Sequence, residues 1–167
     1  MDATALRAMQ APIKERYKGE PGAAMITLKA KGTLDGQNIA CKVETGRALA
    51  IAGLHPATGG SGLELCSGDM LLEALVACAG VTLRAVATSL EIPVAGGTVT
   101  AEGDLDFRGT LGVDRDAPVG FRAIRLIFEL DSTANADDLD ALIATTERYC
   151  VVLQTLRATP ELSVTRG

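Results

Sequence analysis

The longest apolar stretch of the chain, GDMLLEALVACAGVTLRAVATSL at residues 68–90, constrains the fold more than any other feature. Apolar side chains recur at helical spacing on one face that includes Cys78, and they also cover much of the remaining surface. Ser67 is a suitable N-cap, and Asp69 in the first turn suits the positive end of the helix dipole. Because a helix that is apolar nearly all round must be covered on most sides, we expect a central, buried helix with Cys78 near its middle.

Alternating apolar and polar residues predict strands on both sides of this helix. The segments that show the alternation are residues 26–30, 39–43, 49–51, 99–107 and 124–130. Asp35 and Gly36 form a turn signal between the first two segments, which predicts an antiparallel meander with one buried face. Leu162 and Val164 alternate in the same way, so we expect a last, short edge strand there.

Two further helices are predicted from the same kind of periodicity. The first covers residues 2–17 and ends before Pro21. The second starts near Asn135 and carries Cys150 on its apolar face. Its apolar character continues past Val151, which indicates a kink near that position rather than an end.

The predicted order is therefore strands, long helix, two strands, helix and strand. This order is typical of an α+β fold in which an antiparallel or mixed sheet packs on two helices. No internal repeat or linker divides the chain, so we expect a single domain over residues 1–167, with an N-terminal helical arm at 1–20 and a core at 25–165.

The charge pattern excludes several classes of partner. The net charge is −5 and no cluster of lysine and arginine is present, which argues against nucleic acid and against an acidic membrane surface. Arg108 and Arg115, between the last two long strands, are most simply surface charges. The N-terminus does not resemble a signal peptide, and the longest uncharged part of the central stretch, residues 74–83, is too short to cross a bilayer. We therefore expect a cytoplasmic protein.

The four cysteines, Cys41, Cys66, Cys78 and Cys150, form no CxxC motif, and His55 is the only histidine. These spacings fit no zinc pattern, so we expect neither a metal nor a cofactor. Cys41 lies on the apolar side of its strand and is most simply a core residue. Cys66 lies just before the central helix, where the helix dipole favours a thiolate, so it is a further candidate for a reactive thiol. His55 is a candidate general base, but the sequence offers it no matched serine or aspartate, and packing in its glycine-rich loop is the simpler interpretation.

Three motifs and the order of the elements together resemble the OsmC/Ohr family. The motifs are HPATGGSG at residues 55–62, GDMLLEALVACAG at residues 68–80 and ERYCVVLQTL at residues 147–156. The resemblance covers roughly residues 25–165 and points to a divergent OsmC-like branch. It implies an intertwined homodimer with the long helices at its centre and each active site at the subunit interface. It also implies thiol-dependent reduction of organic hydroperoxides.

On this resemblance Cys78 is the peroxidatic thiol and Cys150 the resolving thiol. The chemistry requires two thiols, because the first becomes a sulfenic acid and the second condenses with it to a disulfide. An external dithiol, such as a lipoylated protein, then reduces that disulfide.

The family holds its reactive thiol with an arginine from the N-terminal strands and a glutamate near the start of the central helix. Arg47 is the nearest candidate for that arginine, with Arg16 as a second, and Asp69 is the acid. Asp69 lies nine residues before Cys78 and therefore starts on the opposite side of the helix. Val151 follows the second cysteine where the family usually has proline.

A second hypothesis keeps the same fold without redox chemistry. In that case the chain is a binding module that holds a small hydrophobic ligand in an apolar pocket at the dimer interface. Contact between the sulfurs of Cys78 and Cys150, and a guanidinium near Cys78, would favour the enzyme. Separate cysteines, each sealed in the core, would favour the binding module.

Overall fold

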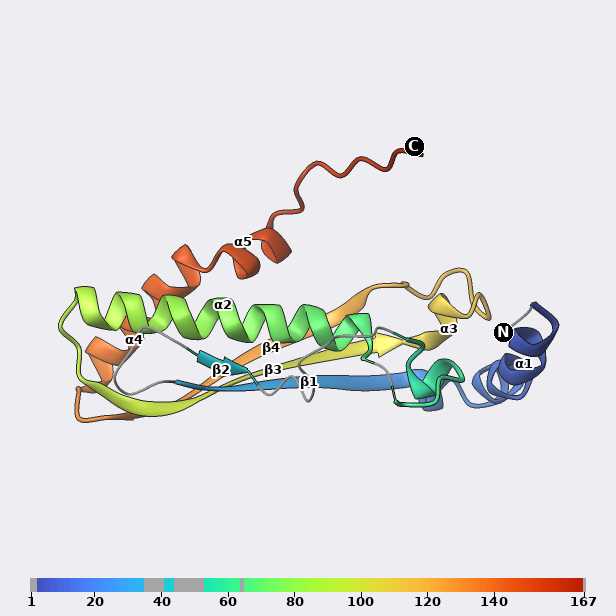
Figure 1. Cartoon of the computed structure of the whole chain (residues 1–167), viewed down its shortest axis with the longest axis horizontal. Helices are drawn as coiled ribbons and strands as arrows, with labels where there is room; N and C mark the ends of the chain where they lie inside the picture. The colour runs from blue at the N-terminus through green and yellow to red at the C-terminus, as the bar shows by residue number, and fades with distance from the viewer. Residues whose placement is uncertain (1–2, 35–40, 44–52, 64, 167) are drawn as a thin grey trace. The chain divides into compact units, whose positions relative to one another are not determined.

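The computed structural model describes residues 3–34, 41–43, 53–63 and 65–166. These residues belong to two compact units: the first unit draws on residues 1–31, 44–73 and 100–127, and the second unit on residues 32–43, 74–99 and 128–167. In chain order the elements are α1 (Ala3–Gly19), η1 (Pro21–Ala24), β1 (Met25–Leu34), β2 (Cys41–Val43), η2 (Pro56–Thr58), α2 (Ser67–Ser89), β3 (Val94–Asp106), α3 (Phe107–Thr110), β4 (Phe121–Ser132), α4 (Ala136–Tyr149) and α5 (Val151–Arg157) (Figure 1).

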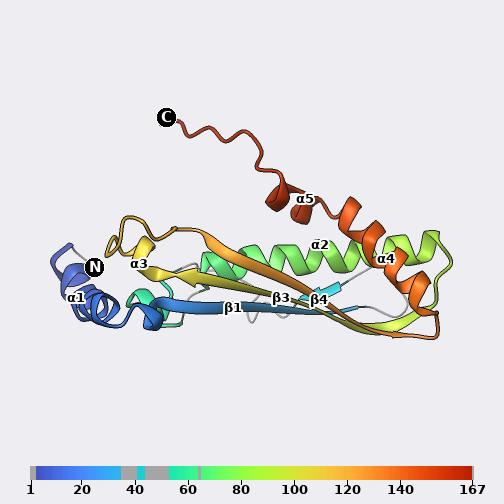
Figure 2. The same cartoon turned by 180° about the vertical axis from the view of Figure 1, so that it is seen from behind.

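The strands form one four-stranded sheet in the order β2-β1-β3-β4, and β1, β3 and β4 run side by side in both views (Figures 1 and 2). Strand β2 pairs antiparallel with the end of β1, with Gly32 opposite Val43 and Leu34 opposite Cys41. The predicted turn between these strands and the predicted strand at 49–51 lie outside the described residues. The α+β class with an antiparallel sheet is confirmed.

Strand β3 shows the predicted alternation most clearly. Val99, Ala101 and Leu105 are buried, while Thr100 and Glu102 between them are only partly covered. Strand β4 alternates half-buried residues with exposed ones in the same way. This pattern is expected for an antiparallel sheet with one face on the core and the other toward water.

Helix α2, 23 residues long, supplies much of the core. Its fully buried residues are spaced three or four apart, as one helix face requires, and are Leu72, Leu75, Val76, Ala79 and Leu83. We expected the rest of the protein to cover this helix on most sides. On its other face, however, Leu71 and Val81 are about two-fifths exposed and Ala74 is exposed as well. Within one copy of the chain, α2 therefore presents an apolar stripe to solvent.

The apolarity of α2 also bears on the membrane question. By length and composition alone the helix is long and apolar enough to cross a membrane. The uncharged run at residues 74–83, which is shorter than the helix, did not predict this. A core helix of a water-soluble fold meets the same criterion, and 39% of the most apolar window is buried inside the protein. We assign α2 to the core on its fully buried leucines.

Helix α4 begins where the sequence predicted. The side chain of Asn135 accepts a hydrogen bond of 2.9 Å from the backbone N–H of Asp138 and so caps the helix. The kink predicted near Val151 is confirmed, because α4 ends at Tyr149 and α5 starts at Val151. Cys150 is the residue between them, with an extended ψ of 104°.

The predicted last edge strand is wrong. Residues 158–166 form neither helix nor strand, and the side chains of Leu162 and Val164 are 77% and 99% exposed. Two alternating apolar positions bury too little surface to offset the entropy lost when a chain end is ordered on a sheet.

Candidate active site

The two predicted thiols lie together in the second unit. Cys78 comes from the middle of α2 and is half-buried, whereas Cys150 is fully buried at the junction of α4 and α5. Both are free thiols, and they lie close enough for each to influence the pKa of the other. Cys78 is thus more exposed than the sequence predicted.

The break between α4 and α5 creates this site. Leu142, Thr146 and Cys150 follow one another at intervals of four residues, which places Cys150 on the buried face of α4. The extended ψ of Cys150 then turns the chain, so that the backbone N–H groups of Val151 and Val152 act to lower the pKa of the Cys78 thiol. The first turn of a helix leaves its N–H groups without helical partners, so they are available to a thiolate.

The environment separates the pKa values of the two thiols. Burial by itself raises the pKa of Cys78, but hydrogen bonds from the backbone of Val152 and Val151 and from the side chains of Cys150 and Thr82 outweigh it and lower the pKa. Burial is also the largest effect on Cys150; the N–H of Leu153 opposes it and the neighbouring Cys78 reinforces it, so the pKa rises to about 11. Cys78 is therefore the thiol of the pair that loses its proton first, while Cys150 keeps its proton.

Asp69, the acid predicted to serve Cys78, interacts electrostatically with His55 in the first unit, and its role at Cys78 stays a prediction. Burial raises the pKa of Asp69, and His55 opposes that shift. Burial lowers the pKa of His55, and Asp69 opposes it. The sequence suggested no acidic partner for His55, because only the fold brings Asp69 close to it.

His55 itself has the packing role that its loop predicted. Its Nδ1 accepts a 3.0 Å hydrogen bond from the backbone N–H of Ala57, which caps η2. Its ring stacks on Phe107, with 5.0 Å between the ring centroids. Because Nδ1 is an acceptor, the proton of the neutral imidazole is on Nε2.

The predicted arginine is not located by the structure. Arg47 lies outside the described residues, and Arg16 forms a 3.9 Å exposed ion pair with Glu20, which lies just beyond the end of α1. Among the described residues, the groups that set the pKa of Cys78 are hydrogen-bond donors and include no guanidinium. Nor do the described residues place three or more His, Cys, Asp or Glu side chains where they could hold a metal ion.

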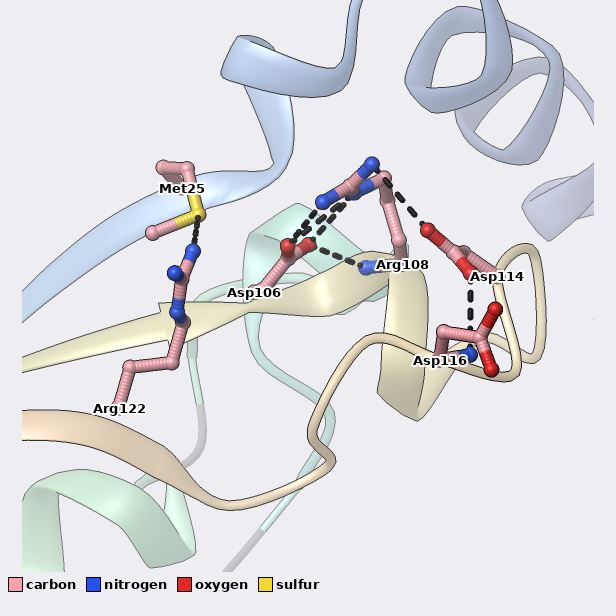
Figure 3. Close-up of polar contacts among 6 residues, drawn as sticks. All are labelled: Met25, Asp106, Arg108, Asp114, Asp116 and Arg122. Carbon is pink, nitrogen blue, oxygen red and sulfur yellow. Dashed lines mark hydrogen bonds and ion pairs between the residues drawn. The ribbon is translucent and has the colours of Figure 1, made fainter.

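Arg108 is not the surface charge that the sequence suggested (Figure 3). Its guanidinium binds both carboxylate oxygens of Asp106, at 3.0 and 2.6 Å, and approaches Asp114 at 3.3 Å. Asp106 is only 1% exposed, and the hydrogen bonds from Arg108 hold its pKa below the usual range. A buried carboxylate requires such a partner, so Arg108 fixes the start of the β3–β4 loop rather than serving a thiol.

The first unit also contains a cavity of about 410 Å³. Its wall is mainly apolar, formed in large part by Leu54, Leu71, Leu105, Phe107, Val119 and Phe121. His55, with its Nε2–H, and the half-buried thiol of Cys66 add polar groups to this wall. Cys66 was predicted as a candidate reactive thiol, but nothing in the sequence indicated that it lines the same cavity as His55.

Comparison with known proteins agrees with this architecture. The family model for the OsmC-like protein matches residues 60–165. A crystal structure of an OsmC-like hydroperoxide resistance protein from Jannaschia sp. CCS1 is similar at a TM-score of 0.60 and 18% identity, over 83% of this chain and 91% of that chain. No curated protein matches the sequence. The structural similarity supports the fold, and the family model covers more than half of the chain: the chain belongs to the OsmC-like protein family.

Proposed function

We propose that the chain reduces organic hydroperoxides, with Cys78 as the peroxidatic thiol and Cys150 as the resolving thiol. Membership in the OsmC-like family supports a peroxide-related role at the level of the family, and the similar Jannaschia protein is named a hydroperoxide resistance protein. The observation that carries the proposal is the contact between the two thiols, combined with the opposite shifts of their pKa values.

The first step is attack of the Cys78 thiolate on one oxygen of the peroxide. A sulfur–oxygen bond forms, the O–O bond breaks, and the other oxygen takes up a proton and leaves as an alcohol. Sulfur is oxidised by two electrons to a sulfenic acid while the peroxide is reduced. The donors from Val151, Val152 and Thr82 favour the thiolate that this step requires.

The second step is attack of Cys150 on the sulfur of the sulfenic acid. A disulfide forms, the sulfur–oxygen bond breaks, and the oxygen leaves as water with the proton that Cys150 had kept. An external dithiol, for which a lipoylated protein is one source, then returns both thiols to the reduced form. We place this cycle in the cytoplasm.

A second copy of the chain is the partner that we propose for the exposed stripe of α2. Leu71, Ala74, Val81 and Ala85 are exposed along this helix, and Cys78 lies among them. An apolar surface of this kind gains free energy when it is covered. A homodimer through α2 would bury the stripe and close the surroundings of the Cys78 thiol.

Peroxide treatment followed by peptide mapping tests the proposed function. One equivalent of cumene hydroperoxide is expected to link Cys78 to Cys150 and to leave Cys66 free, because only the first two thiols are in contact. The products are read by mass spectrometry after free thiols are blocked. In Cys150→Ser the oxidation should stop at a sulfenic acid on Cys78, which dimedone traps. If both thiols of the unmodified chain stay free, the two-cysteine mechanism is wrong.

The cavity of the first unit favours a second candidate function, the binding of a small apolar molecule. Its volume of about 410 Å³ falls in the range of small-molecule sites, about 300–1,000 Å³. The Nε2–H of His55 has no hydrogen-bond partner among the described residues. An uncharged ligand that carries one hydrogen-bond acceptor fits such a wall, since the nearby carboxylate of Asp69 disfavours an anion.

Gly120→Phe is expected to abolish binding in this cavity. Gly120 lines the cavity, and a side chain added there meets no atom within 4 Å, so the ring should enter the open space without disturbing the fold. The probe is the uncharged dye N-phenyl-1-naphthylamine for general apolar binding, followed by uncharged aromatic ketones in isothermal titration calorimetry. Gly96→Phe is the matched control, because it also has space but lies outside the cavity. Equal ketone affinity in both variants would exclude the cavity as the site.

A further inference from the structure

One buried hydroxyl near the thiol pair has no partner. Thr146 is fully buried on α4, and its Oγ1 makes no hydrogen bond to any described residue. Other threonines in the helices behave differently: Thr145 donates to the backbone oxygen of Ala141 at 2.7 Å, and Thr155 to that of Val151 at 2.8 Å. The hydroxyl of Thr146 therefore does not donate a hydrogen bond to the backbone carbonyl one turn earlier. A buried polar group without a partner costs free energy and is normally avoided.

The position of Thr146 relates this hydroxyl to the thiols. Thr146 lies one turn before Cys150, whose backbone N–H donates a 2.9 Å hydrogen bond to the backbone carbonyl oxygen of Thr146. Side chains four residues apart in a helix are neighbours on one face, and the thiol of Cys150 contacts that of Cys78. The hydroxyl is not among the groups that hydrogen-bond to Cys78 in the reduced state. An oxygen added to the sulfur of Cys78 would supply an acceptor beside the thiol of Cys150, one helical turn from this hydroxyl.

We propose that Thr146 donates a hydrogen bond to the oxygen of the sulfenic acid on Cys78 and positions that oxygen as the leaving group. The inference rests on the proposed function and adds a residue to its second step. As the sulfur of Cys150 bonds to the sulfur of Cys78, the sulfur–oxygen bond breaks and the oxygen gains negative charge. The hydrogen bond from Thr146 strengthens while the proton of Cys150 completes the water molecule. The oxidised state thus supplies the acceptor that the reduced state lacks.

Thr146→Val tests this role, because valine keeps the shape of the side chain and removes the hydroxyl. Formation of the sulfenic acid should be unchanged, whereas its conversion to the disulfide should slow about tenfold, as expected for the loss of one hydrogen bond in a transition state. The measurement is a single turnover with one equivalent of cumene hydroperoxide, quenched at intervals with dimedone and a thiol-blocking reagent. Mass spectrometry then gives both rates.

Stability and two control variants separate this role from a structural one. The melting temperature of Thr146→Val should equal or exceed that of the unmodified chain, since an unpaired buried hydroxyl is removed. Thr146→Ser retains the hydroxyl and should restore the rate. Thr145→Val should leave the rate unchanged, because that hydroxyl is already bonded to Ala141.

The possible outcomes distinguish failure of the role of Thr146 from failure of the proposed function. If the unmodified chain forms the disulfide and Thr146→Val forms it at the same rate, the role of Thr146 is wrong and the proposed function stands. If Thr146→Val is slow only because it is less stable, the role is wrong as well. If the unmodified chain leaves Cys78 and Cys150 free after peroxide treatment, the proposed function fails and the role of Thr146 fails with it.

Discussion

Cys78→Ser is expected to abolish the reduction of organic hydroperoxides. A serine hydroxyl is not ionised near neutral pH and does not attack an O–O bond, so no first step remains. Serine is nearly the same size as cysteine and stands at a half-buried position, so the fold should persist. Consumption of cumene hydroperoxide with a dithiol reductant measures the loss. Cys66→Ser is the matched control and should keep the activity of the unmodified chain.

The pH dependence of the unmodified chain provides a further control on this result. The lowered pKa of Cys78 means that its thiolate is already formed at a pH where an ordinary thiol, with a pKa of about 8.5, is still protonated. The rate of the first step should therefore rise with pH with a midpoint below the pKa of an ordinary cysteine thiol. Alkylation of Cys150 in the unmodified chain should rise only toward pH 11, following its pKa of about 11. A midpoint for peroxide attack at or above that of an ordinary thiol would contradict the assignment of the thiolate to Cys78.

Leu142→Ala is expected to destabilise the fold by about 2–5 kcal/mol, the range observed when a fully buried leucine is truncated. Leu142 is completely inaccessible on the face of α4 that also carries Thr146 and Cys150. Its removal leaves a cavity beneath the helix that leads to Cys150. Urea denaturation followed by circular dichroism measures the free energy of unfolding.

Two variants bracket the size of this effect. Leu142→Met preserves most of the volume and should cost less than about 1.5 kcal/mol. Leu162→Ala lies in the exposed C-terminal segment and should change the free energy of unfolding by less than about 0.5 kcal/mol. A loss for Leu142→Ala as small as that for Leu162→Ala would show that α4 is not packed as described.

Local signals in the sequence were sufficient to predict most of the elements. The helix at 2–17 corresponds to α1, α4 starts next to Asn135 as predicted, and the alternation at 99–107 corresponds to β3. Each of these depends on residues within a few positions of one another, through capping hydrogen bonds or the period of the side chains. The edge strand at Leu162 and Val164 was wrong, because alternation alone does not show that a sheet edge is available.

Contacts between distant residues required the structure. The sequence alone determined that the chain has a long apolar helix carrying Cys78, a second helix carrying Cys150 and an α+β order, and the resemblance to a family suggested that the two thiols pair. Only the tertiary structure decided that Cys150 is the break between α4 and α5, so that the N–H groups after it reach Cys78.

The same distinction applies to charge and burial. Tertiary structure alone brought Asp69 to His55, joined Arg108 to the buried Asp106 and left the hydroxyl of Thr146 without a partner. The physical reason is that periodicity and capping are set by neighbours in the chain. The pKa of a thiol, by contrast, is set by whichever donors, charges and solvent the packing of separate elements places around it.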